Sequence, residues 1–129
     1  PLYRYIIRGL LDRLLPDPAL MTDLPSSGRA SLTNQEARGR YVLHLLYGAP
    51  QVRGNAVPTR DGVRVMEMIE DIPAIGPVSA RVRLPAAPKR AYEAVSGEAL
   101  EVTDFGDGQY GVTLPSLRIH AAVVFEQNA

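Results

Sequence analysis

The first fifteen residues place their apolar side chains with the period of an α-helix. Charged side chains fall between the apolar ones, as in an amphipathic helix, and Pro16 and Pro18 end the pattern. We therefore predict a helix over residues 2–15. Its apolar positions are Leu2, Tyr3, Ile6, Ile7, Leu10, Leu11, Leu14 and Leu15.

The apolar surface of this helix covers an arc of roughly 200°, about twice the width of an ordinary apolar stripe. Such a helix needs two packing partners. Either both belong to the core of this domain, or the helix bridges to a partner in a part of the protein outside this chain. In the bridging interpretation one face packs on the domain, and the flanking face stays partly exposed. The packed face would hold Ile6, Leu10 and Leu14, and the exposed one Ile7, Leu11 and Leu15.

After the linker residues 25–28, the pattern changes to short segments with a period of two, separated by Gly and Pro turns. About eight such segments follow, and no second helical period appears. The pattern predicts a mainly β fold, an antiparallel, jelly-roll-like β-sandwich of about eight strands preceded by one N-terminal amphipathic helix. The expected strands cover residues 29–33, 40–47, 62–72, 78–84, 90–95, 99–103, 110–114 and 117–125.

The chain is expected to divide into two parts. Residues 1–24 form the helix and a linker, the end of a preceding domain, and residues 25–129 form the sandwich. The chain starts without an initiator Met and enters the helix almost at once, as would a piece of a longer polypeptide. The phase of strand 62–72 stays open, because Glu67 falls among its apolar positions and requires either a bulge or a sheet edge. The expected shared core includes Leu43, Leu45, Val82, Val112, Ile119 and Val123.

Composition excludes several classes of protein. Fourteen Lys and Arg balance fourteen Asp and Glu, so the basic excess typical of nucleic-acid binding is missing. No Cys is present, which excludes disulfides, thiolate metal sites and a cysteine nucleophile. No segment has the roughly 20 apolar residues of a membrane span or the pattern of a secretory signal. The sequence is typical of a soluble protein without nucleic-acid or membrane partners, and it leaves the compartment open.

Candidate catalytic groups are few. His44 and His120 are the two histidines, and neither stands in a catalytic or metal-binding motif. The apolar strand around His44 favours a buried, hydrogen-bonded structural role over a catalytic base. Asp104 and Asp107 lie in a Gly-rich stretch that favours turn chemistry over calcium binding, because the full ligand set of a calcium loop is missing. We therefore predict no catalytic residue, no metal and no cofactor.

The other carboxylates could supply an acid and base pair of the glycosidase type. Their positions on strand edges and turns favour solvated side chains instead. They are Glu67, Glu70, Asp71, Glu98 and Glu101.

Aromatic residues offer a further hypothesis, since sugar-binding sandwiches stack sugar rings on exposed aromatic side chains. The chain has no Trp, six Tyr and two Phe. Tyr5, Tyr92 and Tyr110 are the tyrosines expected to be exposed, although packing is the simpler role for each. Tyr92 and Tyr110 are the candidate ligand-binding residues.

Taken together, the segments resemble the C-terminal portion of large β-galactosidase-like and related glycoside hydrolases. LYRYIIRGLLDRLLPDP is similar to the last helix of the amidotransferase-like, trimerisation-like domain that follows the catalytic barrel. SSGRASLTNQEARGRYVLHLLYGAP resembles the first strand pair of the C-terminal domain, and MEMIEDIPAIGPVSARVRLP its acidic turn and next strand. AYEAVSGEALEVTDFGDGQYGVTLPSLRIHAAVVFE resembles the final hairpins.

The resemblance implies a non-catalytic accessory domain, because the catalytic carboxylates of the family lie on a barrel outside this chain. Its partners would be the preceding domains of the same polypeptide, reached through the N-terminal helix, and a second copy in a homo-oligomer. A carbohydrate-binding module is the alternative, with carbohydrate as the partner. A small stand-alone enzyme using the carboxylates named above is the third reading.

Overall fold

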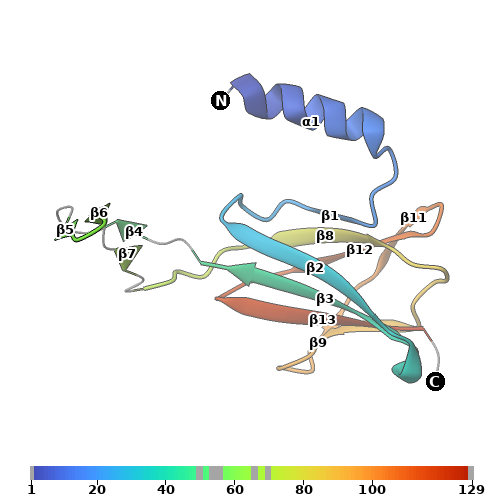
Figure 1. Ribbon diagram of the computed structural model, residues 1–129. Helices are drawn as coiled ribbons and strands as arrows, with labels where there is room; N and C mark the ends of the chain where they lie inside the picture. The colour runs from blue at the N-terminus through green and yellow to red at the C-terminus, as the bar shows by residue number, and fades with distance from the viewer. Residues whose placement is uncertain (1, 49–50, 53–56, 65–66, 69–70, 128–129) are drawn as a thin grey trace.

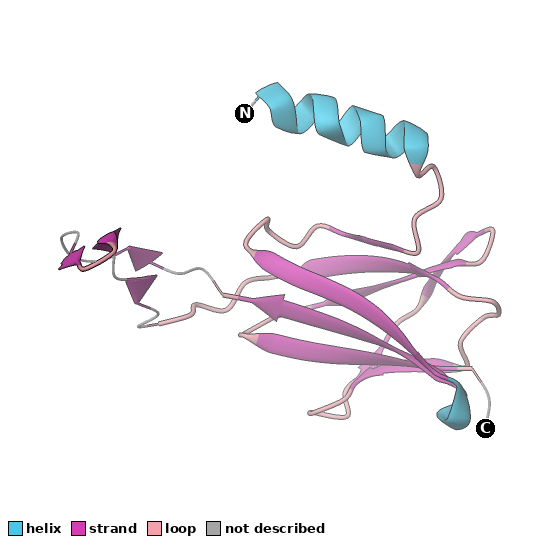
Figure 2. Ribbon diagram, in the orientation of Figure 1, coloured by secondary structure: helices cyan, strands magenta, loops and turns pink. Residues whose placement is uncertain are grey.

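The computed structural model describes residues 2–48, 51–52, 57–64, 67–68 and 71–127, and it confirms a mainly β fold with one N-terminal helix (Figure 1). Helix α1 covers Leu2–Leu14, in agreement with the predicted helix. The strands form two main sheets that face each other, with α1 outside them (Figure 2). Within the described part of the chain, no helix combines the length and the apolar character needed to cross a membrane.

We call the two main sheets sheet A and sheet B. Sheet A has the strand order β1-β8-β12-β11, and sheet B has the order β10-β9-β13-β3-β2; all pairs are antiparallel. The strands of sheet A are β1 (Leu20–Thr22), β8 (Val78–Arg83), β12 (Gln109–Leu114) and β11 (Thr103–Gly106). Those of sheet B are β10 (Ala99–Leu100), β9 (Arg90–Glu93), β13 (His120–Glu126), β3 (Arg40–Tyr47) and β2 (Gly28–Gln35).

Short elements complete the fold. A 3-10 helix, η1 (Glu36–Arg38), joins β2 to β3, and Gly39 follows it with a φ of 57°, a left-handed conformation that glycine adopts without strain. Two small hairpins project from one end of the sandwich (Figure 1). They pair β4 (Gln51–Val52) with β7 (Glu67–Met68) and β5 (Val57–Thr59) with β6 (Gly62–Arg64).

The core lies between the two sheets and takes apolar side chains from alternate positions of β3, β8, β12 and β13. In β8, for example, Val78, Ala80 and Val82 are buried, and Ser79 and Arg81 face outward. Five of the six expected core residues are confirmed at 0–4% exposure: Leu43, Leu45, Val82, Val112 and Val123.

The prediction that Ile119 belongs to the core is wrong, since 49% of its surface is exposed. The expected strand 117–125 begins only at His120, because Ile119 has a φ of 64° and turns the chain. Leu117, two residues earlier, is buried and forms an isolated bridge with Ile75. The alternating apolar residues from Leu117 onward therefore belong first to a turn and then to a strand. The alternation is the same in both, so it does not show where the strand begins.

Two other expected strands are divided in the structure. Residues 99–103 contribute β10 to sheet B and the first residue of β11 to sheet A, so the chain crosses between the sheets within this segment. Residues 62–72 contribute β6 and β7, which lie in different hairpins. The open question about the phase of Glu67 falls on a side chain outside the described part. In addition, β1 lies within the expected helix and linker segment 1–24 and pairs with β8.

Helix α1 does not pack by the face expected in the bridging interpretation. Ile6, Leu10 and Leu14 are 53%, 53% and 75% exposed. The flanking Ile7, Leu11 and Leu15 are also exposed, as that interpretation expected. The helix instead stands beyond the outer side of sheet A (Figure 1). A groove lies between the helix and the sheet.

Candidate functional site: a groove between helix α1 and sheet A

The groove between α1 and the outer face of sheet A has a volume of about 1200 Å³. The helix contributes one wall through Arg8, Leu11 and Asp12, and Leu15 follows at its end. The opposite wall combines one edge of the sheet, β1, with the outward side chains of β8, β11 and β12. The lining thus mixes aliphatic, aromatic, hydroxyl and charged groups, so it suits a ligand or a protein surface that is itself partly apolar and partly polar.

An aromatic side chain, Phe105 of β11, lies at the centre of the sheet wall. Its ring covers Gly111 of β12 so closely that a Cβ atom there would lie 2.6 Å from Cε2 of the ring. The guanidinium carbon of Arg81 lies 3.7 Å from the centroid of the same ring, in a cation–π contact. Phe105 is nevertheless 51% exposed. The absence of a side chain at Gly111 therefore makes room for an aromatic surface that faces the groove.

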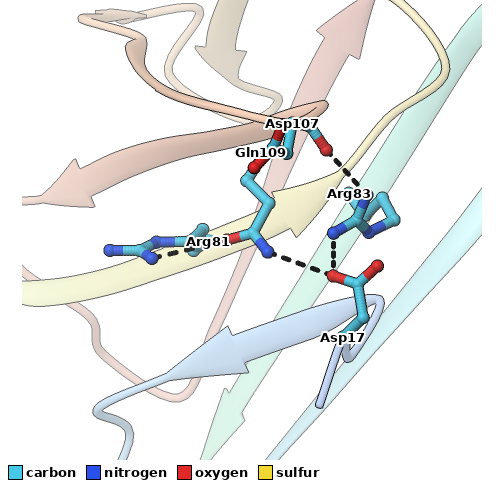
Figure 3. A network of polar contacts seen from close by, with 5 residues as sticks. All are labelled: Asp17, Arg81, Arg83, Asp107 and Gln109. Carbon is cyan, nitrogen blue, oxygen red and sulfur yellow. Dashed lines mark hydrogen bonds and ion pairs between the residues drawn. The ribbon is translucent and has the colours of Figure 1, made fainter. Parts of the chain in front are cut away.

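A network of polar contacts connects the segment after α1 to sheet A (Figure 3). Asp17 pairs with the Arg83 guanidinium, and its Oδ1 accepts a hydrogen bond of 3.3 Å from Nε2 of Gln109. Arg83 also donates to the backbone oxygen of Asp107 at 2.6 Å, and Arg81 donates to Oε1 of Gln109 at 3.4 Å. Bonds from β8 and β12 thus hold the linker against the sheet and place the end of α1 beside the groove.

Hydroxyl groups lie along the other end of the groove. Thr22 donates from Oγ1 to the backbone oxygen of Ser79 at 2.9 Å, and Oγ of Ser79 lies 3.3 Å from Oγ1 of Thr113. Asp23 accepts the backbone N–H of Ser79 at 2.8 Å. These groups can exchange hydrogen bonds with a polar ligand, since each hydroxyl can both donate and accept.

The groove does not contain the arrangement of a nucleophile, a base and an orienting group that covalent catalysis requires. Its lining has no His; the Asp23 carboxylate is engaged with the backbone, and Asp12 is the other carboxylate of the lining. Across the described ranges, no cluster of three or more His, Asp or Glu side chains is arranged to hold a metal ion.

Tyr92, a candidate ligand-binding residue, lies on β9 of sheet B, remote in the sheet order from the groove. Its hydroxyl donates to Oε1 of Glu126 at 3.2 Å, and the guanidinium carbon of Arg90 lies 5.0 Å from its ring centroid. Arg90 and Glu126 form a bidentate ion pair at 2.7 and 2.8 Å. Hydrogen bonds from Arg90 lower the pKa of Glu126, and the same carboxylate raises the pKa of Arg90. Tyr92 is thus half-buried in an ion-pair cluster.

Tyr110, the other candidate, was expected to be exposed, and this is wrong. It is only 9% exposed and belongs to the core between the sheets. Tyr110 pairs with Val82 and shares the inward phase of Val112 and Leu114 on β12. The phase of the strand decides where this side chain points. Tyr5 is 74% exposed, as expected.

The structure brings the two histidines together. Nδ1 of His44 lies 3.2 Å from Nε2 of His120, and the rings stack with centroids 5.4 Å apart and an interplanar angle of 14°. Register explains this, because His44 pairs with Ala122 on the neighbouring strand and His120 is two residues away on the same face. His44 is half-buried, so the expected full burial is not found, but its expected hydrogen bond is present.

A smaller cleft of about 310 Å³ lies beside His120 and includes Glu93, Glu98 and Arg118. Burial raises the pKa of Glu93, but hydrogen bonds from the backbone N–H groups of Ser96 and Val95 outweigh it and lower the pKa overall. The Glu93 carboxylate thus stabilises the turn that follows it, at Val95 and Ser96.

Two of the remaining candidate carboxylates, Asp104 and Asp71, have partners in the structure. Asp104 accepts the backbone N–H of Gly106 at 2.8 Å, which is the turn chemistry that the sequence favoured. Asp71 lies 3.9 Å from the Arg118 guanidinium, and both side chains are exposed. The side chains of Glu67 and Glu70 lie outside the described part of the chain.

The groove could not be predicted from the sequence, because its lining comes from five separate elements. Phe105, Gly111 and Arg81 lie on three neighbouring strands, so their stacking follows only once the register of these strands is known. The alternation within 78–84 indicates which side chains share a face, but not how that strand aligns with β11 and β12.

Neither a protein-family model nor a curated protein matches the chain. Among solved structures, α-L-fucosidase isoenzyme 2 from Paenibacillus thiaminolyticus is similar to it, with a TM-score of 0.79 and 34% sequence identity over 95% of this chain. The chain spans only 17% of the length of that fucosidase chain. A specific likeness to β-galactosidases is not confirmed. The chain is similar to a domain of a glycoside hydrolase, and the predicted relationship to that class of enzyme is supported.

Proposed function

We propose that the chain is a non-catalytic accessory domain of a larger glycoside hydrolase, and that α1 binds the preceding domains of the same polypeptide. The observation that carries this proposal is the extent of the fucosidase match, which covers 95% of this chain and 17% of the other. A glycoside hydrolase needs two carboxyl groups placed on either side of the scissile bond. The described carboxylates instead cap turns, pair with arginines or stand in solvent.

The exposed apolar surface of α1 supports the second part of the proposal. Six aliphatic side chains between Ile6 and Leu15 are 49–75% exposed. Exposed apolar patches of this kind mark interaction surfaces. Arg8 and Asp12 lie beside them on the groove side. An apolar surface with a charged border is typical of an interface between domains. The occupant of this interface in the proposal is the remainder of a longer polypeptide.

Two measurements test the proposal. The 129-residue chain is assayed with aryl α-L-fucosides and aryl β-galactosides, and we expect no turnover above a heat-denatured control. Hydrogen exchange of residues 2–15 is then compared between this chain and the protein encoded by the full reading frame. We expect slower exchange of these amides in the longer protein. Turnover by the 129-residue chain contradicts the non-catalytic role, and equal exchange contradicts the interface.

A carbohydrate-binding role is the second candidate, favoured by the exposed Phe105 ring within a groove that also holds hydroxyl groups. Aromatic faces pack against the C–H groups of sugars, and hydroxyls pair with sugar hydroxyls. In this alternative the binding residues are Phe105, Arg81 and Thr113, and neither Tyr92 nor Tyr110 takes part.

Titration with L-fucose and with fucosylated oligosaccharides, followed by NMR chemical shifts, tests this alternative. Binding should shift the signals of the groove and disappear in Phe105→Ala. Tyr92→Ala is the matched control, because it removes a half-buried aromatic ring from the other sheet. Binding that survives Phe105→Ala but is lost in Tyr92→Ala would mean that the sugar binds at Tyr92 and not in the groove.

A further inference from the structure

The sandwich has four edge strands, and three of them are poorly suited to pairing with another strand. β1 has three residues and follows Pro16 and Pro18, and β10 has two residues. β11 has four residues, and its register shifts between Asp104 and Gly106. Short edges and bulges of this kind are how sheet proteins avoid joining edge to edge.

The fourth edge, β2, lacks these protections. It runs for eight residues in unbroken register with β3, from Gly28 opposite Tyr47 to Gln35 opposite Arg40. It contains no Pro and no Lys, and Arg29 is its single charged residue. Long, flat and nearly uncharged edges are templates for another strand.

In the described sheets, no strand pairs with β2 on its side away from β3, and Leu24 lies over Gly28 at the start of the strand. Five of its eight residues are exposed, including Ala30 and Asn34, which share the inward phase of Leu32. Among the described residues, the one backbone hydrogen bond that β2 makes outside the sheet ladder is from Gly28 to Pro25. The main-chain groups along this edge are therefore available to a partner strand.

We propose that β2 pairs with β2 of a second copy of the chain, antiparallel and across a two-fold axis, so that the two B sheets become one continuous sheet. In an antiparallel pair, facing residues point to the same side, so a symmetric pairing centres on Ser31 or on Leu32. The first register places Arg29 opposite Thr33, and the second places it opposite Gln35. Neither register brings two charges together, so the strand is complementary to itself.

The proposal does not depend on the proposed accessory function, since it rests on the backbone edge of β2 and not on the side chains of α1. The three protected edges leave β2 as the one edge that can form a long ladder in the described fold. A two-fold axis also closes the assembly, because each copy offers a single such edge.

Charge substitutions at the outward positions of β2 test the pairing. Ser31→Lys with Thr33→Lys places like charges opposite each other in either register. Ser31→Glu with Thr33→Glu does so fully in the register centred on Leu32, whereas in the register centred on Ser31 residue 33 faces Arg29 and the two effects offset each other. Sedimentation velocity of the 129-residue chain should show a dimer for the wild type. The lysine variant should dimerise about 10- to 100-fold more weakly, and the glutamate variant should do so if the pairing centres on Leu32. An equimolar mixture of the two variants should restore the dimer, because Lys then faces Glu.

The matched control is Thr103→Lys with Thr113→Lys, which adds the same charges to exposed outward positions of sheet A. This variant should remain dimeric, and circular dichroism should show that all variants keep the strand content of the wild type. Leu11→Glu with Leu15→Glu tests the competing contact through α1 and should leave the dimer intact.

A cross-link gives a second readout, because the protein has no native cysteine. Ser31→Cys with Thr33→Cys should form a covalent dimer on oxidation, and Thr103→Cys with Thr113→Cys should not. A monomeric wild type at about 100 μM overturns the proposal, since edge pairing over eight residues would be populated there. A dimer that survives both charge variants, or that is lost in the α1 variant alone, also overturns it, as does open-ended assembly.

Discussion

Helix α1 and strand β13 are both rich in apolar residues, yet β13 is buried and α1 is exposed. From Ala121 to Phe125, β13 is 0–7% exposed, because β3 and β9 flank it and sheet A covers its inner face. The aliphatic residues of α1 from Ile6 onward are 49–75% exposed. Apolar content shows that a segment needs a partner, and it does not show where the partner is. For β13 the partner is this fold, whereas the apolar side chains of α1 stay exposed in it.

The largest expected effect is in β13. Phe125→Ala should lower the free energy of unfolding by about 3–5 kcal/mol, because it removes a fully buried ring and leaves a cavity. Urea denaturation measures this. Ile119→Ala is the control, since Ile119 is half exposed just before the strand, and its cost should stay below about 1 kcal/mol. Equal costs at both positions would place Ile119 in the core after all.

An intermediate effect is expected on the surface that α1 faces. Gly111→Ala should cost about 1–2 kcal/mol, because the added methyl displaces the Phe105 ring. In a Phe105→Ala background the same substitution should cost much less, and a double-mutant cycle in urea measures the difference. Additive costs would mean that the ring does not rest on Gly111.

A smaller effect, dependent on pH, is expected at the far end of β13. The pKa of Glu126 is lowered in the fold by Arg90, so its ion pair contributes stability above the usual carboxyl pKa of 4.5 and loses it as the pH falls further. Thermal unfolding at pH 6 and pH 3 should therefore show a smaller acid-induced loss for Glu126→Gln than for the wild type. An unchanged loss would show that the pair is screened by solvent.

The smallest effect is expected in α1. Leu11→Gln with Leu15→Gln should change the free energy of unfolding of the 129-residue chain by no more than about 0.5 kcal/mol, since both side chains are already exposed. Val123→Gln in β13 is the comparison and should prevent folding or destabilise it strongly. A large loss from the α1 substitutions would show that the helix supports this sandwich directly.

Much of the fold could be predicted because it is local. β3 was predicted with its observed bounds, and the inward phase of 78–84 was right, because alternation marks which side chains share a face. Ile119 and Tyr110 show the limit of this signal. The first has a backbone turn that its apolar side chain conceals, and the second follows a Gly-rich turn but points inward.

The candidate site could not be predicted in the same way. The His44–His120 contact requires the register between β3 and β13, and the Phe105 stack requires three strands in register. Nothing in the alternation of one strand fixes its alignment with another. The position of α1 beyond sheet A depends on Asp17, whose pairing with Arg83 links residues far apart in the chain.

The contact between Phe105 and Gly111 has a consequence for how related sequences can diverge. The ring occupies the space of the missing side chain, so position 111 cannot gain a side chain without displacing Phe105. A relative with a side chain at position 111 should carry a small residue at position 105, and Arg81 should then lose the aromatic face on which it lies. Positions 81, 105 and 111 are therefore expected to vary together, and the presence of all three marks the homologues that share this groove.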